Sequence, residues 1–329
     1  MIKKNKYPNF SIIIPNYNGA KFLPKCLNSI KKAIQKCSNS KFEIIIIDNG
    51  SSDNSIVITQ KIFKNFKEKN LKSKIINLKS NTGFANAVNI GINQSQYNFV
   101  IPCNNDLILD PNWFKTISQS IQKNQNPKIV TFFGTILTKD GAKYESTGLE
   151  FFIQGKAKNI LNGQSFNKNL LSKTNKLVWG TSAALVVYKK NIIQQIGLFD
   201  DDFFAYEEDV DLALRFHNLG FKTLYIPTAI CYHLGGGTSN SMGNFRQRMD
   251  TKNWIYIIIK NYSAKEFWFN FPIIIIERLR NLSYLIKSTQ KKYLLPIDLI
   301  KTYGEVLIKF PKMIKKRHQI KKLIKSINL

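Results

Sequence analysis

Acidic residues are sparse in this basic sequence, and a third of them lie within one twelve-residue segment. The segment contains Asp200, Asp201, Asp202, Glu207, Glu208, Asp209 and Asp211. A carboxylate within hydrogen-bond reach of a hydroxyl can take its proton during a reaction. A carboxylate is also a preferred ligand of hard divalent cations. This segment is therefore the first candidate for acid–base or metal chemistry.

A helix can explain part of this cluster without any chemistry. The spacing predicts a helix from about residue 207 to 218, closed by Gly220 near its C-terminal cap. Glu207, Glu208 and Asp209 would then occupy its first turn, where the helix dipole favours carboxylates. Capping alone is a sufficient explanation for Glu207.

The remaining acids divide between pairing and catalysis. Asp211 and Arg215 lie four residues apart and can form an ion pair along the helix. Residues 200–202 are expected to form a loop, with contact to a metal or an acceptor as the less favoured alternative. For Asp209 we favour a catalytic role over capping.

Two further aspartates stand where apolar runs end. Asp48 opens "DNGSSDNS", which is either a turn with Ser52 or Asp53 capping the next helix or a loop whose Asp48 accepts hydrogen bonds from a nucleotide. Asp106 ends "NND", and a lone loop aspartate is usually solvated or a cap. At a sheet edge, however, Asp106 can ligate a divalent cation that bridges diphosphate oxygens.

The elements that must position these residues follow from alternating patterns. The apolar runs "FSIIIP", "FEIIIID", "SKIINL" and "YNFVIP" predict four strands. Apolar residues at helical spacing follow the first two, namely Leu23, Leu27, Ile30 and Ile34, then Ile56, Ile62, Phe63 and Phe66. This alternation predicts an α/β fold with a mostly parallel, Rossmann-like sheet and helices on both faces. Strands so apolar are expected to be buried on both faces.

Polar loops follow the four predicted strands. They read "PNYNG", "DNGSSD", "NTGFANA" and "CNND". In open α/β sheets, ligands bind in the crevice at the carboxyl ends of the strands. The four loops therefore predict one shared site.

The second half of the chain has a different character. From about 129 to 187 two β-like runs, "IVTFFGTIL" and "LVWGTSAALVVY", surround an irregular insert. After about Gly243 the sequence becomes basic, aromatic and helical in pattern. We therefore predict two domains, residues 1–243 and 244–329.

The charge distribution gives two alternatives for a partner. The formal net charge is +28, and 43 of the 49 cations are Lys, so part of the excess can reflect base composition of the genome. From Arg246 onward, however, 19 cations face only five acids. Nucleic acid is one possible partner, but no recognisable nucleic-acid-binding module accompanies the charge. Peripheral contact with an anionic membrane is favoured.

The C-terminal pattern supports that preference. Met313, Ile320, Ile324 and Ile327 recur at helical spacing among Lys residues, which predicts an amphipathic basic helix. The alternative is a helical subdomain that only packs on the rest of the chain. No run approaches the roughly 18 apolar residues of a membrane-spanning helix, and Ile12–Ile14 is too short for a signal peptide. The four cysteines form no C-x-x-C pair. A cytoplasmic protein at the inner face of the cell membrane is expected.

Taken in order, these motifs resemble glycosyltransferase family 2. They are "SIIIPNYNG", "EIIIIDNGSSDNS", "NTGFANAVNIGI", "CNNDLILDPNWF", "WGTSAALVV", "IGLFDDDFFAYEEDVDLALRFHNLGFKTLYIP" and "YHLGGGTS". More narrowly, they resemble rhamnosyltransferase-like members that build bacterial surface polysaccharides. The resemblance covers roughly residues 9 to 240. It implies a GT-A fold, a nucleotide-sugar donor, a divalent cation (Mg²⁺ or Mn²⁺) and inversion at the anomeric carbon.

The resemblance also assigns roles to individual residues. Asp48 matches the nucleotide-contacting aspartate, and Asp106 matches the last position of the D-x-D-like metal motif. Asn104 replaces the first aspartate of that motif, which leaves one fewer carboxylate for the metal. His233 matches a late metal or diphosphate ligand, although it could equally satisfy a backbone carbonyl. The glycines of "GGGTS" after it permit close approach to phosphate.

The catalytic assignment rests on "EED". Glu208 and Asp209 match the family's E-D pair, whose aspartate acts as the base and whose glutamate supports it. The expected donor-binding residues are Pro15, Tyr17, Asn18, Asp48, Asn81, Gly83, Asn104, Asn105, Trp179 and Gly180. Trp179 has core packing as its alternative role.

The resulting hypothesis is an inverting, metal-dependent glycosyltransferase. It would transfer a sugar from a UDP- or dTDP-sugar to a lipid-linked or growing cell-surface glycan. It would not bind nucleic acid. The alternatives are a basic nucleic-acid-binding protein and an inactive glycosyltransferase-like membrane module.

Overall fold

The structure is a computed structural model that describes residues 7–235, 244–289 and 295–327. Its strands are β1 Phe10–Asn16, β2 Phe42–Asp48, β3 Leu71–Asn77, β4 Phe99–Pro102, β5 Leu107–Leu109, β6 Ile129–Thr138, β7 Tyr144–Ser146, β8 Leu149–Phe152, β9 Lys156–Asn159, β10 Lys176–Val178, β11 Val186–Lys189 and β12 Lys222–His233. Its α-helices are α1 Leu23–Gln35, α2 Ser55–Lys64, α3 Phe84–Asn93, α4 Trp113–Lys123, α5 Lys190–Gln195, α6 Glu208–Asn218, α7 Phe245–Asn261, α8 Ala264–Phe269, α9 Phe271–Ser288 and α10 Leu295–Ile327. Two short 3₁₀ helices are η1 Lys168–Leu170 and η2 Asp201–Phe203.

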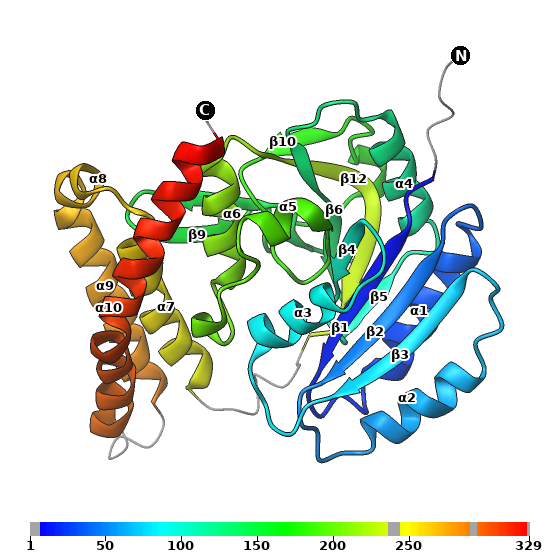
Figure 1. The fold of residues 1–329 in the computed structure, drawn as a ribbon, viewed down its shortest axis with the longest axis horizontal. Coiled ribbons are helices and arrows are strands. Elements are labelled where there is room, and N and C mark those ends of the chain that lie inside the picture. The colour runs from blue at the N-terminus through cyan, green and yellow to red at the C-terminus, as the bar shows by residue number, and fades with distance from the viewer. Residues whose placement is uncertain (1–6, 236–243, 290–294, 328–329) are drawn as a thin grey trace.

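One large twisted sheet organises the molecule (Figure 1). Its main path runs β10-β12-β6-β11-β4-β1-β2-β3, with β5 attached to β12 and β7 attached to β6. Strands β1 to β4 pair in parallel, and so do β6 and β12, whereas β11 runs antiparallel between β4 and β6. The prediction of an α/β fold with a mostly parallel sheet is confirmed.

The strands at the centre of the sheet are buried on both faces. In β1, Ile12 and Ile14 pack in one hydrophobic cluster and Ile13 packs in another. Because successive side chains of a strand point to opposite faces, these clusters cover the two sides of the sheet. The expectation of burial on both faces is wrong for β3, where Lys72 and Ser73 are exposed. β3 is the last strand of the sheet path, so it lacks the cover that β1 and β2 have.

The run "LVWGTSAALVVY" is only partly a strand. β10 ends at Val178 and β11 begins at Val186, and the segment between them has no regular strand. This irregular segment lies beside the N-terminus of α6, where Asp209 accepts a hydrogen bond from its backbone. A functional contact therefore replaces the sheet pairing that the apolar pattern suggested.

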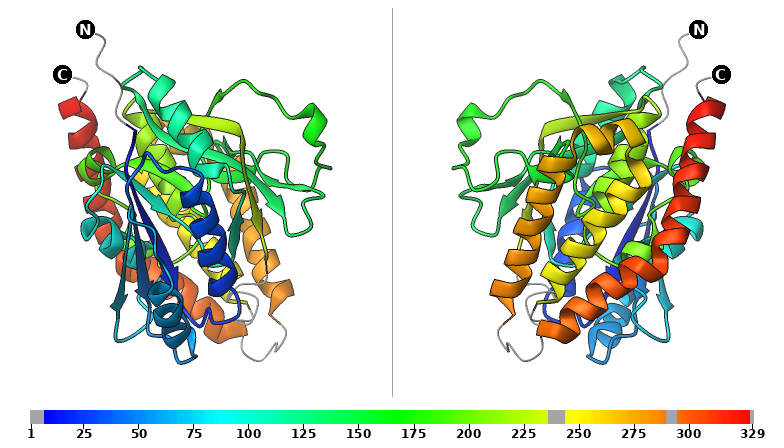
Figure 2. Two further views of the ribbon diagram at one scale, coloured as in Figure 1. Left: turned by 90° about the vertical axis from the view of Figure 1, so that its right-hand side faces the viewer. Right: turned by 90° about the vertical axis from the view of Figure 1, so that its left-hand side faces the viewer.

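Helices α7, α9 and α10 stack side by side on the edge of the molecule next to α6 (Figures 1 and 2). Their core is shared with the rest of the chain, since Tyr256 and Met313 cluster with Leu149, Phe203 and Val210. The division at residue 243 remains a prediction. Across the described ranges, no helix is both long enough and apolar enough to cross a membrane.

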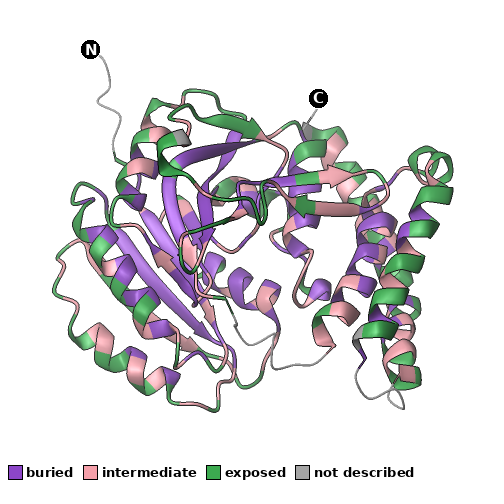
Figure 3. Cartoon of the chain, turned by 180° about the vertical axis from the view of Figure 1, so that it is seen from behind, coloured by how far each residue is buried: buried purple, intermediate pink, exposed green. Residues whose placement is uncertain are grey.

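Two residues of the apolar stripe predicted for the last helix face inward. Met313 is fully buried, and Ile324 packs against the cluster beneath the sheet. Other apolar residues of α8, α9 and α10 are exposed instead, and Figure 3 shows much of the outward surface of α9 as exposed. These two residues therefore hold the helix to the protein.

Candidate active site

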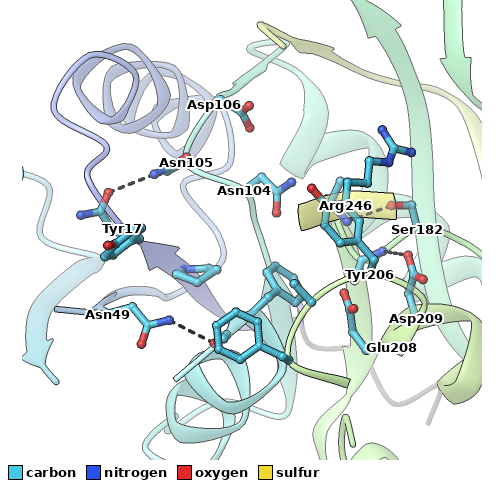
Figure 4. A pocket seen from close by; sticks show the side chains of 18 of the residues that line it. Tyr17, Asn49, Asn104, Asn105, Asp106, Ser182, Tyr206, Glu208, Asp209 and Arg246 are labelled. Carbon is cyan, nitrogen blue, oxygen red and sulfur yellow. Dashed lines mark hydrogen bonds between the residues drawn. The ribbon is translucent and has the colours of Figure 1, made fainter. Parts of the chain in front are cut away.

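A cavity of about 540 Å³ lies between the carboxyl ends of the parallel strands and the N-terminus of α6 (Figure 4). Its lining includes Pro15, Asn16, Tyr17, Asn49, Asn81, Gly83, Phe84, Asn104, Asn105, Asp106, Glu145, Ser182, Ala183, Ala184, Phe204, Ala205, Tyr206, Glu208, Asp209, His233, Gly235, Phe245 and Arg246. The polar loops after β1 to β4 thus meet in one place, as their positions in the sequence predicted.

Side-chain amides form one wall of the cavity. The Asn105 amide donates to the side-chain oxygen of Asn16 at 2.9 Å. The Asn49 amide donates to the backbone oxygen of Gly83 and to the side chain of Asn81, both at 3.0 Å. These bonds join loops that are far apart in the sequence. They leave a wall of neutral donors and acceptors suited to a polar ligand such as a nucleotide or a sugar.

Gly83 is required by a close backbone approach. Its φ of +88° lies in a region that other residues rarely adopt, and a Cβ at this position would lie 2.5 Å from the backbone oxygen of Phe204. Ala85 also donates to that oxygen, at 3.3 Å. Gly83 therefore allows the loop before α6 to close against the start of α3.

Six of the predicted donor-binding residues line the cavity, and four do not. The six are Pro15, Tyr17, Asn81, Gly83, Asn104 and Asn105. The four that are not among the described lining residues are Asn18, Asp48, Trp179 and Gly180. Their proposed donor contacts remain predictions.

The surroundings of those four residues indicate what they do in this structure. Asp48 is buried and accepts hydrogen bonds from Asn16 and Ser51, at 3.0 and 2.6 Å. Trp179 stacks on Phe151, with ring centroids 4.9 Å apart. Asp48 thus ties the loop after β2 to the end of β1, and Trp179 takes part in core packing.

Three other polar residues meet at the far end of the cavity. The His233 ring nitrogen Nε2 lies 3.1 Å from Asp106 Oδ1, and Nδ1 lies 2.5 Å from Glu145 Oε1. Burial lowers the pKa of His233, but hydrogen bonds to the two carboxylates outweigh burial and raise it to about 10. The carboxylates therefore stabilise positive charge at this point.

The donor set fits a divalent cation that the substrate helps to bind. Mg²⁺ typically takes one or two protein carboxylates and completes its shell with water and substrate phosphates. Asp106 and the Nε2 atom of His233 would supply such an incomplete set if the cation takes the place of the proton between them, and Glu145 can orient the ring from behind, as carboxylates do for metal-bound histidines. In the parts of the chain that are described, no cluster of three His, Cys, Asp or Glu forms a complete metal site. Most of "GGGTS", from residue 236 on, lies outside the described residues.

Asp209 is held at the opposite wall by α6 (Figure 4). The backbone N–H of Ala183 donates to its Oδ2 at 3.1 Å, and the N–H of Val210 donates to its Oδ1 at 2.8 Å. Burial raises the pKa of Asp209, although these hydrogen bonds partly offset the rise. A raised pKa makes a carboxylate a better proton acceptor near neutral pH.

Glu208 adds a second buried carboxyl group to this wall. Its Oε2 has no hydrogen-bond partner among the described residues. Burial, and then the neighbouring Asp209, raise the pKa of Glu208 well above its usual range. Across the described ranges neither carboxyl group forms an ion pair with a cation, whereas Asp200 and Asp202 earlier in the same segment both do.

The segment before α6 has an unusual backbone. Phe204, Tyr206 and Glu207 all have positive φ angles, between 64° and 68°. The amide of the fully buried Asn253 on α7 donates to the backbone oxygens of residues 203, 205 and 206, at 2.7 to 3.0 Å. Strained backbone persists where the surroundings hold it. α7 therefore helps to present Asp209 to the cavity.

The first-turn expectation for Glu207 is wrong. Glu207 precedes α6 in a left-handed conformation, and its side chain makes no capping hydrogen bond. The predicted pair of Asp211 and Arg215 is present, at 3.0 Å. Asp211 has a second cation partner, since Lys260 of α7 lies 2.8 Å away.

The expectation that residues 200–202 form only a loop is also wrong. Asp200 caps the short helix η2 through its side chain. It pairs with Lys260 and Lys316, while Asp202 pairs with Lys312 and Lys316. These acids therefore attach α7 and α10 to the rest of the molecule through ion pairs with lysines.

Several lining residues had not been predicted. Asn49 belongs to the polar loop "DNGSSD", and Arg246 is one of only six arginines, so both offered a signal. Ser182 and Tyr206 lie within the motifs "WGTSAALVV" and "IGLFDDDFFAYEEDVDLALRFHNLGFKTLYIP" but were not singled out, and Glu145 offered no signal, because only the folded chain brings it to the cavity.

Comparison with known proteins gives the family. The sequence model of Glycosyl transferase family 2 matches residues 11–197. Poly-beta-1,6-N-acetyl-D-glucosamine synthase of Staphylococcus epidermidis is 26% identical over 255 residues, covering 74% of this chain and 58% of the relative. The synthase of the same name from Staphylococcus aureus (strain COL) is 26% identical over 250 residues, covering 74% and 56%. This chain thus spans less than two thirds of those relatives.

Solved structures share the fold at low sequence identity. GalNAc-T7 with UDP, GalNAc and Mn²⁺ has a TM-score of 0.60 and 16% identity, covering 91% of this chain and 58% of that one. The mannosyltransferase PcManGT from Pyrobaculum calidifontis, in complex with GDP-Man and Mn²⁺, has a TM-score of 0.56 and 13% identity, covering 98% and 87%. S. aureus TarS 1-349 in complex with UDP has a TM-score of 0.51 and 15% identity, covering 94% and 91%. They agree with the predicted GT-A fold, and because the family model matches more than half of the sequence, this chain belongs to glycosyltransferase family 2.

Proposed function

We propose that this protein transfers a sugar from a nucleotide-diphosphate donor to a hydroxyl group of a cell-surface glycan, with inversion. The observation that carries the proposal is the single cavity shared by the amide wall, the Asp106–His233 pair and Asp209. A donor on the amide wall would present its anomeric carbon toward the opposite wall, which holds Glu208 and Asp209 and is called the acid wall below. Family membership supports the reaction class.

The reaction needs one proton acceptor. The acceptor hydroxyl oxygen attacks the anomeric carbon, and the bond from that carbon to the diphosphate oxygen breaks with its electron pair leaving on the diphosphate. Asp209 takes the hydroxyl proton as the new bond forms. Attack opposite the leaving group inverts the anomeric carbon. Glu208, whose pKa is raised by burial and by the neighbouring Asp209, lies beside the base and supports it in this proposal.

Asp106 and His233 are the residues that would hold a divalent cation. Such a cation, Mg²⁺ or Mn²⁺, stabilises the negative charge that gathers on the leaving diphosphate. Mn²⁺ accompanies nucleotides or nucleotide sugars in two of the structural neighbours, which supports this part of the proposal.

The relatives and structural neighbours suggest a class of sugar and a nucleotide for the donor. The curated relatives are named for N-acetylglucosamine polymers, and UDP is bound in two neighbours. We therefore propose a UDP-N-acetylhexosamine as the first donor to test. A dTDP-linked rhamnose, suggested by the motif resemblance, is the second.

A donor screen tests this function. Purified protein is incubated with UDP-, dTDP- and GDP-sugars, with Mn²⁺, Mg²⁺ or EDTA, and nucleotide release and donor binding are measured. We expect metal-dependent binding of one donor class and its loss in Asp106→Ala. Metal-independent turnover by Asp106→Ala would remove Asp106 from the proposed site, and absence of any nucleotide binding would remove the function.

We also propose that helices α8 to α10 contact an anionic membrane, where a lipid-linked or growing glycan is available. Large apolar side chains are exposed along these helices. They are Trp268, Phe269, Phe271, Ile273, Ile275, Ile276, Leu279, Tyr284, Ile286, Ile297, Ile300, Leu307, Ile308 and Phe310. Such a patch on a basic region fits a bilayer interface, where apolar residues enter the headgroup boundary and Lys meets anionic lipid.

Liposome flotation of the full chain tests this contact. Replacement of Leu307 and Ile308, which are 74% and 80% exposed, by Ser should reduce flotation with anionic vesicles. Val57→Ser on the distant helix α2, where Val57 is 50% exposed, is the control. Equal flotation of the two variants would contradict the proposal.

A further inference from the structure

A second cavity, of about 240 Å³, lies beside the catalytic one. It is lined by Lys156, Ala157, Glu207, Arg246, Gln247, Asp250, Thr251, Trp254, Glu277, Arg278, Asn281 and Tyr284. Arg246 lines both cavities, and Glu207 directly precedes the Glu208–Asp209 pair. The second cavity therefore continues from the acid wall, on the side away from the amide wall.

Polar atoms in this cavity lack partners although they are buried. Within the described residues, Gln247 Oε1, Asp250 Oδ1 and the Arg278 atoms Nε and Nη1 make no hydrogen bond. The Arg278 guanidinium donates a hydrogen bond from Nη2 to the backbone oxygen of Gly155, at 2.7 Å. A buried polar group without a hydrogen-bond partner destabilises the fold. Four such atoms around one hollow indicate that a hydrogen-bonding ligand or ordered water completes them.

The charges of the lining residues favour a neutral ligand. Lys156, Arg246 and Arg278 are matched in number by the carboxyl groups of Glu207, Asp250 and Glu277, although burial raises the pKa of Glu207 and so favours its neutral, hydrogen-donating form. One cation–anion pair is already formed, because Lys156 lies 2.5 Å from Glu277. The balanced lining presents both donors and acceptors, whereas a phosphate site would have an excess of cations. A polyhydroxylated ring can satisfy both kinds of group.

Size and aromatic content agree with a single sugar ring. The cavity is smaller than the roughly 300–1,000 Å³ of pockets for drug-sized ligands. The Arg278 guanidinium lies over the ring of the buried Trp254, with its Cζ 5.7 Å from the ring centroid. The exposed Tyr284 also lines the cavity. These rings supply apolar faces beside the polar groups.

We propose that this second cavity binds a sugar unit of the glycan acceptor and aligns its hydroxyl with Asp209. This inference rests on the proposed glycosyl transfer. Tyr284 also belongs to the exposed apolar residues of α9, so an acceptor held at a membrane could reach the cavity from that side.

Arg278 and Arg280 provide a matched test, because both lie on α9 and only Arg278 lines the cavity. Arg280 is 71% exposed and pairs with Glu277. Ligand-observed NMR measures binding of the methyl glycosides of N-acetylglucosamine, glucose, galactose and rhamnose to the full chain, saturated with UDP and Mn²⁺. Inorganic phosphate is a fifth probe.

We expect at least one glycoside to bind the wild-type protein. Arg278→Gln should weaken its affinity by about tenfold or more, since a hydrogen bond to a charged group is lost. Arg280→Gln should change it by less than about twofold. Asn281→Ala is a milder second variant, expected to weaken binding about threefold, and thermal unfolding checks that each variant folds. In transfer assays Arg278→Gln should raise the KM for the glycoside and leave donor affinity unchanged.

Three results would overturn the inference: no glycoside bound by the wild type, equal effects of Arg278→Gln and Arg280→Gln, or phosphate binding that depends on Arg278 in place of the sugar. Donor binding is measured separately on the same samples. Failure of UDP and dTDP to bind would count against the proposed function, whereas donor binding with no Arg278-dependent glycoside binding would count against the second cavity alone.

Discussion

Two groups of carboxylates in the same short segment have opposite surroundings. Asp200, Asp202 and Asp211 each contact Lys or Arg side chains, and those cations lower their pKa values even though burial opposes the change. Glu208 and Asp209, which lie between Asp202 and Asp211 in the sequence, have pKa values that burial raises, and neither forms an ion pair with a cation among the described residues. Sequence proximity therefore says little about electrostatic role.

The difference separates structural from chemical carboxylates. A carboxylate neutralised by lysines is a poor proton acceptor, but it can hold two parts of a chain together. A buried carboxylate without a cation destabilises the fold, and such groups gather at functional sites. The first group attaches the C-terminal helices, and the second faces the cavity. Four changes can break or sharpen this comparison.

The largest effect is expected from Asp209→Asn. Loss of a general base typically lowers a rate by about 10²–10⁴-fold, so transfer should fall by that amount while donor affinity stays within about twofold, because the amide is isosteric. Initial rates and nucleotide binding measure the two effects. Asp201→Asn is the control, since Asp201 is exposed and its carboxylate accepts hydrogen bonds from the amides of Asn86 and Asn89. Normal turnover by Asp209→Asn would end the assignment.

The second effect is on stability. Lys260 is 2% exposed and pairs with both Asp200 and Asp211, so Lys260→Met removes a buried cation from two acids. We expect the free energy of unfolding to fall by about 3 kcal/mol, measured by urea denaturation. Lys312→Met is matched to it, because Lys312 also pairs with this group but is 58% exposed. Lys312→Met should lower the free energy of unfolding by less than about 1 kcal/mol. Equal losses in the two variants would contradict a stabilising role for the buried Lys260 pairs.

The third effect appears on acidification. Burial alone would raise the pKa of Asp202. Pairing with Lys312 and Lys316 outweighs burial and lowers this pKa from 3.8 to about 2. A lowered pKa in the folded state means that the stabilisation is complete above the unfolded value, near pH 4, and is lost as pH falls toward 2. This contribution should be about 1–2 kcal/mol, reduced from the full shift because Lys312 is solvated. Unfolding measured from pH 6 to 3 should depend less on pH in Asp202→Asn than in the wild type.

The smallest effect has the opposite sign. Glu208→Gln removes a buried carboxyl group whose pKa is raised, so the wild type loses stability as pH rises through that pKa. The variant should therefore be about 1 kcal/mol more stable than the wild type at pH 8, with the difference fading toward pH 4. Calorimetry at the two pH values measures it. A variant that is less stable at pH 8 would show that Glu208 has a structural partner.

Much of the fold was predictable because it depends on local pattern. The runs around Ile12 and Ile45 are apolar at every position, which is typical of central parallel strands. The loops after them had to meet at one edge of the sheet, so Tyr17, Asn81 and Asn104 were identified as neighbours. Glu145 of β7 and Ser182 of the irregular segment after β10 were not identified, since both reach the site from elsewhere in the chain.

The role of each acid depended on contacts that no local pattern reveals. The helical spacing of Asp211 and Arg215 predicted their pair, but the lysines on α7 and α10 lie some 50 to 115 residues from the acids that they neutralise. The apolar stripe containing Met313 suggested a membrane surface, whereas the folded chain uses it for packing.

The sequence by itself determined the sheet, the position of the polar loops at one edge and the family, because periodicity and motif order are local properties that the fold must respect. Only the tertiary structure decided which carboxylates keep their charge, because a pKa depends on which cations and how much water surround the group. It also decided that the C-terminal helices pack beside Glu208 and Asp209. Asn253 of α7 bonds the backbone before α6, and Lys260 and Lys316 pair with Asp200.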